Sequence, residues 1–194
     1  MRKAFSFCLM AMVSFFVSGC NQADPLAEEI KQQIINPPLK EGAIKLDGLC
    51  LFAYVRESLM KGDVDAEKRK TEALAYVGLI EPVDDASGRY KVTEYGKNFA
   101  KIGLSENSAN VVFCSGKRDV DVSIKEKIND EDVITEVKVS YKDLADWIDN
   151  KRVLEAYPNI KKIREIGTII DESEYRKKDN GEWYMYRPIK SNMD

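Results

Sequence analysis

The most regular pattern in the chain is an alternation of hydrophobic and polar residues in its second half. In residues 119–127 every second residue is hydrophobic as far as Ile124, and residues 133–141 follow a similar alternation. Such a pattern places hydrophobic side chains on one face of a β-strand and polar ones on the other. The polar run 129–132 lies between the two segments. We therefore predict a long antiparallel hairpin with one buried and one solvated face.

The residues after this hairpin predict helix and then a second hairpin. Residues 143–167 are expected to be helical, interrupted or restarted at Pro158. Their hydrophobic residues are available to cover the sheet: Leu144, Trp147, Ile148, Leu154 and Tyr157. Residues 168–175 and 182–187 then predict two strands around the turn-forming pair Asn180-Gly181.

Together with a short buried strand ending at Cys114, these segments predict one α+β unit. It spans residues 105–194 and consists of an antiparallel sheet of four or five strands with covering helices.

The preceding part, residues 44–104, predicts a mostly helical region with one hairpin. A first helix is expected to end at Gly62 and to bury one face, formed by Leu49, Phe52, Ala53 and Leu59 with Cys50 nearby. A second helix is expected to begin after Asp63 or Asp65 and to end at Gly78, burying Ala73, Leu74 and Val77. A strand hairpin around 84–88 follows, and a third helix runs from Thr93 to Gly103.

Residues 20–43 predict a tether with one short helix. Asp24 and Pro25 are suited to its start, and Asn36-Pro37-Pro38 ends it. The segment could be a spacer between a membrane and the body, or a helix that docks on the body or on a partner. We favour the spacer because an isolated short helix is marginal.

The N-terminus has the organisation of a secretory signal. Arg2 and Lys3 precede the apolar stretch 4–17, which ends before Ser18-Gly19-Cys20. Fourteen helical residues would span about 21 Å, less than the ~30 Å of a bilayer core. A cleaved signal peptide, residues 1–19, is therefore expected in place of a transmembrane helix.

Val17-Ser18-Gly19-Cys20 resembles the lipobox of bacterial lipoprotein precursors. The resemblance implies that Cys20 receives diacylglycerol, that the signal is cut between Gly19 and Cys20, and that the new amino group is acylated, with palmitate as the expected chain. Asn21 in place of Asp implies the outer membrane of a Gram-negative bacterium, facing the periplasm. The alternatives are an ordinary secreted protein whose signal ends near a cysteine, and a Gram-positive host.

Composition narrows the possible partners and chemistry. Residues 20–194 carry 28 basic and 33 acidic side chains, a formal charge of −5, without a basic block that would indicate nucleic acid. The chain has no histidine, which excludes Ser–His–Asp and Cys–His catalysis and most zinc sites. Beside Cys8 and Cys20 it keeps Cys50 and Cys114, which an oxidising compartment would join in a disulfide; two buried thiols are the alternative.

Residues 66–100 resemble part of a winged-helix domain. The matching positions are Gly78, Leu79, Ile80, Tyr90, Val92, Thr93, Gly96 and Lys97. DNA binding does not follow, because the wing carries Glu81, Asp84 and Asp85 where phosphate contacts need Lys or Arg. We expect a winged-helix-like architecture in the N-terminal half, without a nucleic-acid partner.

Other motifs carry little chemistry. Ser58 and Lys61 have the S-x-x-K spacing of penicillin-recognising enzymes, but the third motif of that family is missing. Two acidic groups could offer oxygen ligands to calcium: Asp63, Asp65 and Glu67, and Asp130, Glu131 and Asp132. Neither has the glycine and terminal glutamate of an EF-hand loop, so we expect no metal site, no cofactor and no catalytic residue.

The C-terminal strand supplies the best candidate surface. Trp183 and Met185 should lie on one face and Tyr184 and Tyr186 on the other, with one face in the core and the other available as an exposed aromatic row. Trp183, Tyr184 and Tyr186 are the candidate contact residues for an envelope protein or a glycan. The sequence thus predicts a lipid-anchored, non-catalytic binding or structural module. The alternatives are a histidine-independent enzyme acting on cell-wall material and a small-ligand carrier.

Overall fold

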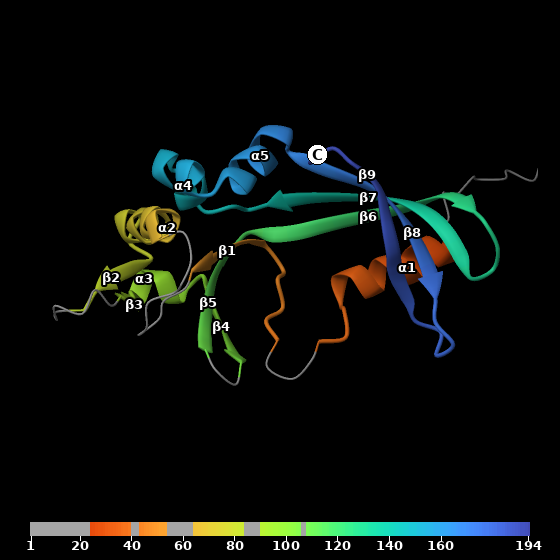
Figure 1. Cartoon of the computed structure of the whole chain (residues 1–194), viewed down its shortest axis with the longest axis horizontal. Coiled ribbons are helices and arrows are strands. Elements are labelled where there is room, and N and C mark those ends of the chain that lie inside the picture. The colour runs from red at the N-terminus through yellow and green to blue at the C-terminus, as the bar shows by residue number, and fades with distance from the viewer. Residues whose placement is uncertain (1–23, 40–42, 54–63, 84–89, 106–107) are drawn as a thin grey trace, which may run out of the picture.

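The computed structural model describes residues 24–39, 43–53, 64–83, 90–105 and 108–194. Its helices are α1 (Pro25–Ile35), α2 (Val64–Tyr76), α3 (Glu94–Lys97), α4 (Lys151–Ala156) and α5 (Pro158–Ile166), with a 3₁₀ turn at Asp146–Asp149. Its strands are β1 (Leu49–Ala53), β2 (Ile80–Pro82), β3 (Tyr90–Val92), β4 (Ala100–Ser105), β5 (Ser108–Ser115), β6 (Lys117–Lys127), β7 (Asp132–Lys142), β8 (Thr168–Lys177) and β9 (Trp183–Ser191). The fold is α+β (Figure 1).

Among the described residues the strands form three antiparallel sheets, ordered β1-β5-β4, β2-β3 and β6-β7-β8-β9. The predicted hairpins are confirmed: β6 pairs with β7, and β8 with β9. Gly181 adopts φ 86° in the turn before β9, a conformation that glycine tolerates. The short β2-β3 hairpin also lies where the sequence predicted it.

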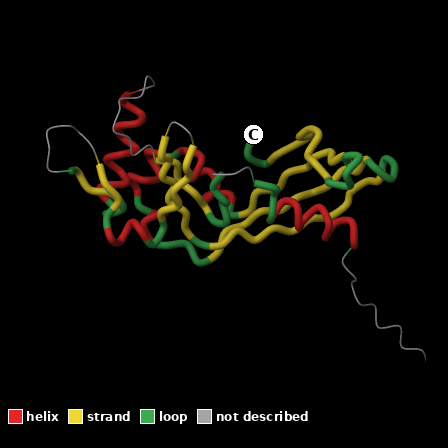
Figure 2. Tube along the Cα trace, turned by 90° about the horizontal axis from the view of Figure 1, so that it is seen from below, coloured by secondary structure: helices red, strands yellow, loops and turns green. Residues whose placement is uncertain are grey.

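Buried residues form two hydrophobic cores. The first, the α2 core, consists of Leu49, Leu51, Ala73, Leu74, Leu79, Ile80, Val111, Phe113, Trp147, Ile148, Val153, Tyr157 and Ile160. The second, the α1 core, consists of Ala27, Ile30, Val120, Val122, Val133, Val137 and Trp183. Figure 2 shows the other helices gathered at one end of the molecule and α1 lying along the long strands at the other end.

Helix α1 is docked, which corrects the prediction of a free spacer over residues 25–35. Ala27 and Ile30 are buried against valines of β6 and β7. The side chain of Gln33 accepts a hydrogen bond of 2.7 Å from the backbone N–H of Trp183. The hydrophobic face of the four-stranded sheet supplies the packing that the short helix lacks on its own.

The predicted cover of this sheet by residues 143–167 is wrong for the same reason. Because α1 already fills the hydrophobic face, Trp147, Ile148 and Tyr157 pack in the α2 core instead. Pro158 does restart the helix, as the first residue of α5.

Two predicted helices contain strands over part of their length. Residues 49–53 form β1, in which Leu49 and Leu51 are buried. A run of five apolar residues is compatible with both a helix and a strand, because it is too short to show the period of either. Pairing with β5 makes it a strand. The helix expected from Thr93 to Gly103 ends at Lys97, after which β4 pairs with β5.

Helix α2 lies where the sequence predicted it, and the structure of its C-terminal end explains why Gly78 follows it. Ala73 and Leu74 are buried, and Gly78 adopts φ 76° just after the helix. The N–H groups of Gly78 and Leu79 donate to the carbonyls of Ala75 and Leu74. These bonds satisfy carbonyls that the end of a helix leaves open.

Candidate binding surface

Exposed hydrophobic side chains concentrate on the last two strands. Among the described residues nine large hydrophobic side chains are exposed: Leu39, Tyr76, Tyr95, Ile128, Ile170, Tyr184, Met185, Tyr186 and Ile189. Five of the nine lie on β8 and β9, and three are consecutive on β9. Tyr184, Met185 and Tyr186, called the β9 surface below, are 39%, 55% and 48% exposed.

Strand β9 is the edge of its sheet and pairs only with β8 among the described strands. The pairing is irregular at two places, between Glu174 and Tyr175 and between Glu172 and Ser173 on β8. On β9 these irregularities leave Tyr186 and Ile189 without a directly opposite residue. Such bulges bend a strand and re-aim its side chains.

The predicted split of this strand into two faces holds only in part. Trp183 is 5% exposed and belongs to the α1 core, so its selection as a contact residue was wrong. Met185, predicted to share its face, is exposed: it lies beside Pro37 and Pro38 in a groove of about 580 Å³, beyond the end of α1. Tyr184 and Tyr186 are exposed, in keeping with the prediction.

A buried carboxylate beneath the surface organises it. Glu174 is only 2% exposed, although it lies on the face of the sheet opposite α1. Its Oε1 accepts hydrogen bonds from Nε and Nη2 of Arg176 at 3.0 and 2.8 Å, and its Oε2 accepts one from Nε of Arg187 at 2.7 Å. Asp132 pairs with the same Nε of Arg176 at 3.0 Å.

Hydrogen bonding sets the charge of this group. The bond from Arg176 holds the pKa of Glu174 below its ordinary value, burial opposes this shift, and the bond from Arg187 adds to it. Glu174 therefore remains an anion that fixes two guanidinium groups.

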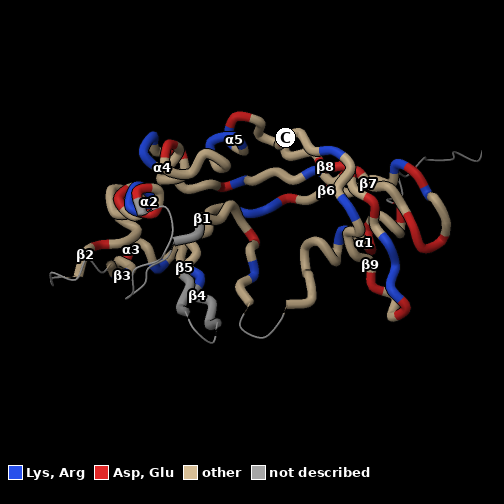
Figure 3. The backbone as a smooth tube through the Cα atoms, viewed as in Figure 1, with Lys and Arg blue, Asp and Glu red and all other residues tan. Residues whose placement is uncertain are grey.

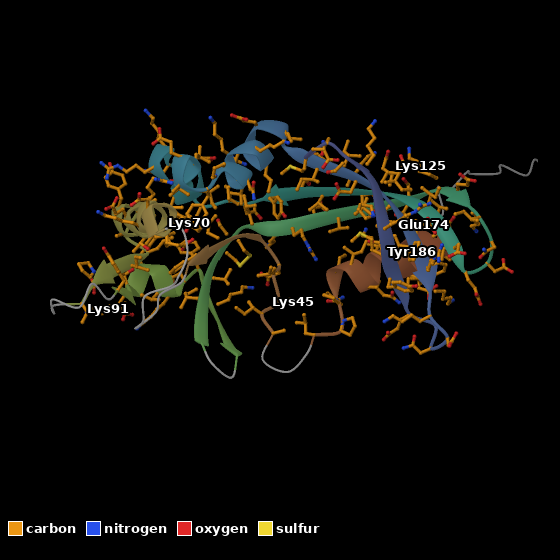
Figure 4. All side chains as sticks on the ribbon, in the orientation of Figure 1. Lys45, Lys70, Lys91, Lys125, Glu174 and Tyr186 are labelled. Atoms are coloured by element: carbon orange, nitrogen blue, oxygen red, sulfur yellow. A yellow bond between two sulfur atoms is a disulfide. The ribbon has the colours of Figure 1, made fainter. Side chains whose placement is uncertain are left out.

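Two cations contact the tyrosine rings, and one of them, Arg176, belongs to the Glu174 network. The Arg176 guanidinium lies 3.4 Å from the ring centroid of Tyr186, and Nζ of Lys178 lies 5.8 Å from that of Tyr184. Figure 4 shows Glu174 and Tyr186 at the same end of the molecule, far from Lys70 on α2. Cation–π contacts of this kind hold a ring in one orientation while its other face stays open to a partner.

The rest of this sheet face carries paired charges. Glu136 accepts from Lys125 at 2.9 Å and from Lys138 at 3.2 Å, and the hydrogen bond from Lys125, followed by that from Lys138, lowers its pKa. Lys142 pairs with Asp119 across β6 and β7. Figure 3 shows acidic and basic residues interspersed along these strands. The surroundings of the β9 surface are thus polar and of mixed sign.

Sequence reasoning found the tyrosines and missed their supports. Glu174 and Arg176 are two residues apart on a predicted strand or at its end, so period-2 alternation could have placed them on one face. Arg187 carried no such signal, because only the bulge at Tyr186 turns it toward Glu174.

The predicted disulfide is confirmed. Cys50 and Cys114 are bonded, with a Cα–Cα distance of 4.0 Å and a sequence separation of 64 residues. The two residues are directly opposite in the β1-β5 pairing, so the bond joins adjacent strands. Gly19, Cys20, Ser58, Lys61 and Asp63 lie outside the described residues.

Two of the candidate calcium ligands make other contacts. Glu67 binds Lys70 at 2.8 Å, and Asp132 binds Asn129 and Arg176. Within the described ranges no group of three or more Cys, Asp or Glu side chains is arranged to hold a metal ion.

Comparisons with known proteins identified no relative of this chain. No protein-family model matches the sequence, and neither a curated protein nor a solved structure matches it significantly. A search of the described helices found none with the length and hydrophobicity needed to cross a bilayer.

Proposed function

We propose that this protein is a non-catalytic binding module of a bacterial cell envelope, anchored through lipid on Cys20 at the outer membrane and facing the periplasm. The β9 surface binds its partner. The observation that carries the proposal is the run of exposed Tyr184, Met185 and Tyr186 on an edge strand, where Arg176 of the buried Glu174–arginine network contacts the ring of Tyr186.

The composition of the surface favours a protein over a glycan. Tyr, Met and Arg are enriched at the centres of protein–protein interfaces. The aliphatic side chains of Met185 and Ile189 are exposed on the same strand as the tyrosines, and such groups add buried apolar area against another protein. Rings that are already ordered lose little conformational entropy on binding.

In this proposal the winged-helix resemblance describes the architecture of the N-terminal half. Helix α2 and the β2-β3 hairpin would form a winged-helix-like scaffold around the α2 core. Glu81 pairs with Lys91 across the hairpin at 3.1 Å, so the lysine of this wing is engaged by an acid. This arrangement supports a partner other than nucleic acid.

The test is site-specific photocrosslinking in intact cells that express the full chain. A photoreactive amino acid at Met185 should crosslink one defined envelope protein, and one at Tyr95, an exposed tyrosine of α3, should not. Replacing Tyr184 and Tyr186 by Ala should lower the crosslink about tenfold or more.

Tyr76→Ala is the matched control, because Tyr76 is exposed and carries Arg152 at 3.9 Å from its ring centroid, as Tyr186 carries Arg176. It should leave the crosslink unchanged. Equal crosslinking from Met185 and Tyr95, or insensitivity to the double alanine change, would show that the β9 surface is not the interface. Labelling of glycan in place of protein would overturn the choice of partner.

A further inference from the structure

A second site lies away from the β9 surface, beside the α2 core. A pocket of about 660 Å³ opens between β1, α2, the start of β6 and the α4–α5 junction. Its apolar lining consists of the partly exposed Leu46 and Ile163 above the buried side chains of Leu49, Leu51 and Ile160. Volumes of 300–1,000 Å³ are typical of sites for small molecules.

The pocket is cationic in a protein whose residues 20–194 carry a net negative charge. Lys70 from α2 and Arg118 from β6 line it, and none of its described lining residues is Asp or Glu. Lys70 donates to Glu67 at 2.8 Å, and Nη2 of Arg118 donates to the Ile34 carbonyl at 2.8 Å. An ammonium has three donors and a guanidinium five, so both keep N–H groups for a ligand.

Asn159 and two tyrosines complete the polar part of the lining. Burial raises the pKa of Tyr141, against a smaller lowering effect of Arg118. Burial also raises the pKa of Tyr157, and the charge of Glu67 adds to that shift. Both hydroxyls therefore stay neutral at physiological pH and neither adds negative charge to the site.

We propose that this pocket binds a single-chain carboxylate amphiphile of medium chain length. The carboxylate is held by Lys70 and Arg118, and the alkyl chain lies against Leu46 and Ile163, above the buried Leu49, Leu51 and Ile160. Lys70 and Arg118 are positively charged and Glu67, which pairs with Lys70, is negatively charged, so the site has one net positive charge. This charge matches a carboxylate monoanion better than a phosphate dianion. The inference uses no residue of the β9 surface and stands apart from the proposed partner.

The test uses a medium-chain fatty acid with a diazirine in its chain, added to the full chain in nanodiscs of zwitterionic lipid. After illumination, mass spectrometry should place the label on peptides containing Leu46–Leu51 or Pro158–Ile163. A probe with the same chain and an amine head should label these peptides about tenfold less. An alkyl phosphate should compete more weakly than the corresponding carboxylate.

Substitutions of two lysines on α2 supply the test variants and their control. Lys70→Gln should lower pocket labelling about fivefold or more, and Lys70→Arg should restore it. Lys68→Gln should have no effect, because Lys68 is 70% exposed and pairs with Glu72. Circular dichroism checks that each variant folds. The proposal would be overturned if the acid and amine probes labelled the pocket equally, and this comparison needs no variant. It would also be overturned if the label were spread evenly over the chain.

Discussion

Loss of the Cys50–Cys114 disulfide should destabilise the protein by an amount set by the chain that it closes. The bond links residues 64 apart in sequence. The chain-entropy relation then gives about 4 kcal/mol at 25 °C. The two cysteines are opposite each other in the β1-β5 pairing, so backbone pairing already holds the two strands together in the folded state. The effect should therefore come from the unfolded state.

The assay is urea unfolding of the full chain in detergent, comparing the natural protein with a Cys50→Ala/Cys114→Ala variant. With an m-value of about 2 kcal/mol per molar urea, the midpoint should fall by about 2 M. Trp147 and Trp183 report on the α2 core and the α1 core, respectively, so fluorescence follows both. Native near-UV circular dichroism before urea is added would show that the variant still folds.

A change below about 1 kcal/mol, with an unchanged m-value, would refute the reasoning from loop entropy. It would mean that the reduced, unfolded chain already holds these strands close together.

Three further predictions concern single residues. Gly96→Ala should destabilise the fold by about 3 kcal/mol or more in the same urea assay, because its Cβ would lie 2.0 Å from the backbone oxygen of Leu79. Ile30→Ala should cost about 2–5 kcal/mol, since Ile30 is fully buried in the α1 core, and a negligible change would contradict the docking of α1. The pKa of Glu174 is lowered from its ordinary 4.5, so its carboxylate stabilises the folded state above pH 4.5, and this contribution is lost as the pH falls through the lowered value. Glu174→Gln should therefore reduce stability at pH 7 and flatten the acid side of a thermal-melting series, and an unchanged acid profile would count against the network.

The two long hairpins could be predicted because each signal is local. In the β6-β7 hairpin, alternating residues occupy one face that α1 buries, and polar residues fill the turn. In the β8-β9 hairpin, Asn180-Gly181 marks the turn, where Gly181 adopts a positive φ. Both patterns specify structure without knowledge of distant partners.

The wrong predictions concern segments whose structure depends on contacts with distant parts of the chain. The run at 49–53 becomes a strand because β5 is available beside it, 60 residues later in the chain. Helix α1 docks because the β6-β9 sheet presents an open hydrophobic face, which in turn leaves residues 146–166 to pack elsewhere. The bulge that turns Arg187 toward Glu174 has no clear mark in the sequence.

The docking of α1 also limits how far the protein can reach from a membrane. The helix takes up residues 25–35, eleven of the residues expected to form a tether. If Cys20 carries lipid as proposed, only the chain from Cys20 to Asp24 separates the anchor from the folded body. Four residue-to-residue steps extend to at most about 14 Å. The β9 surface would then sample a thin layer next to the bilayer, and a partner would have to present its binding site within that layer.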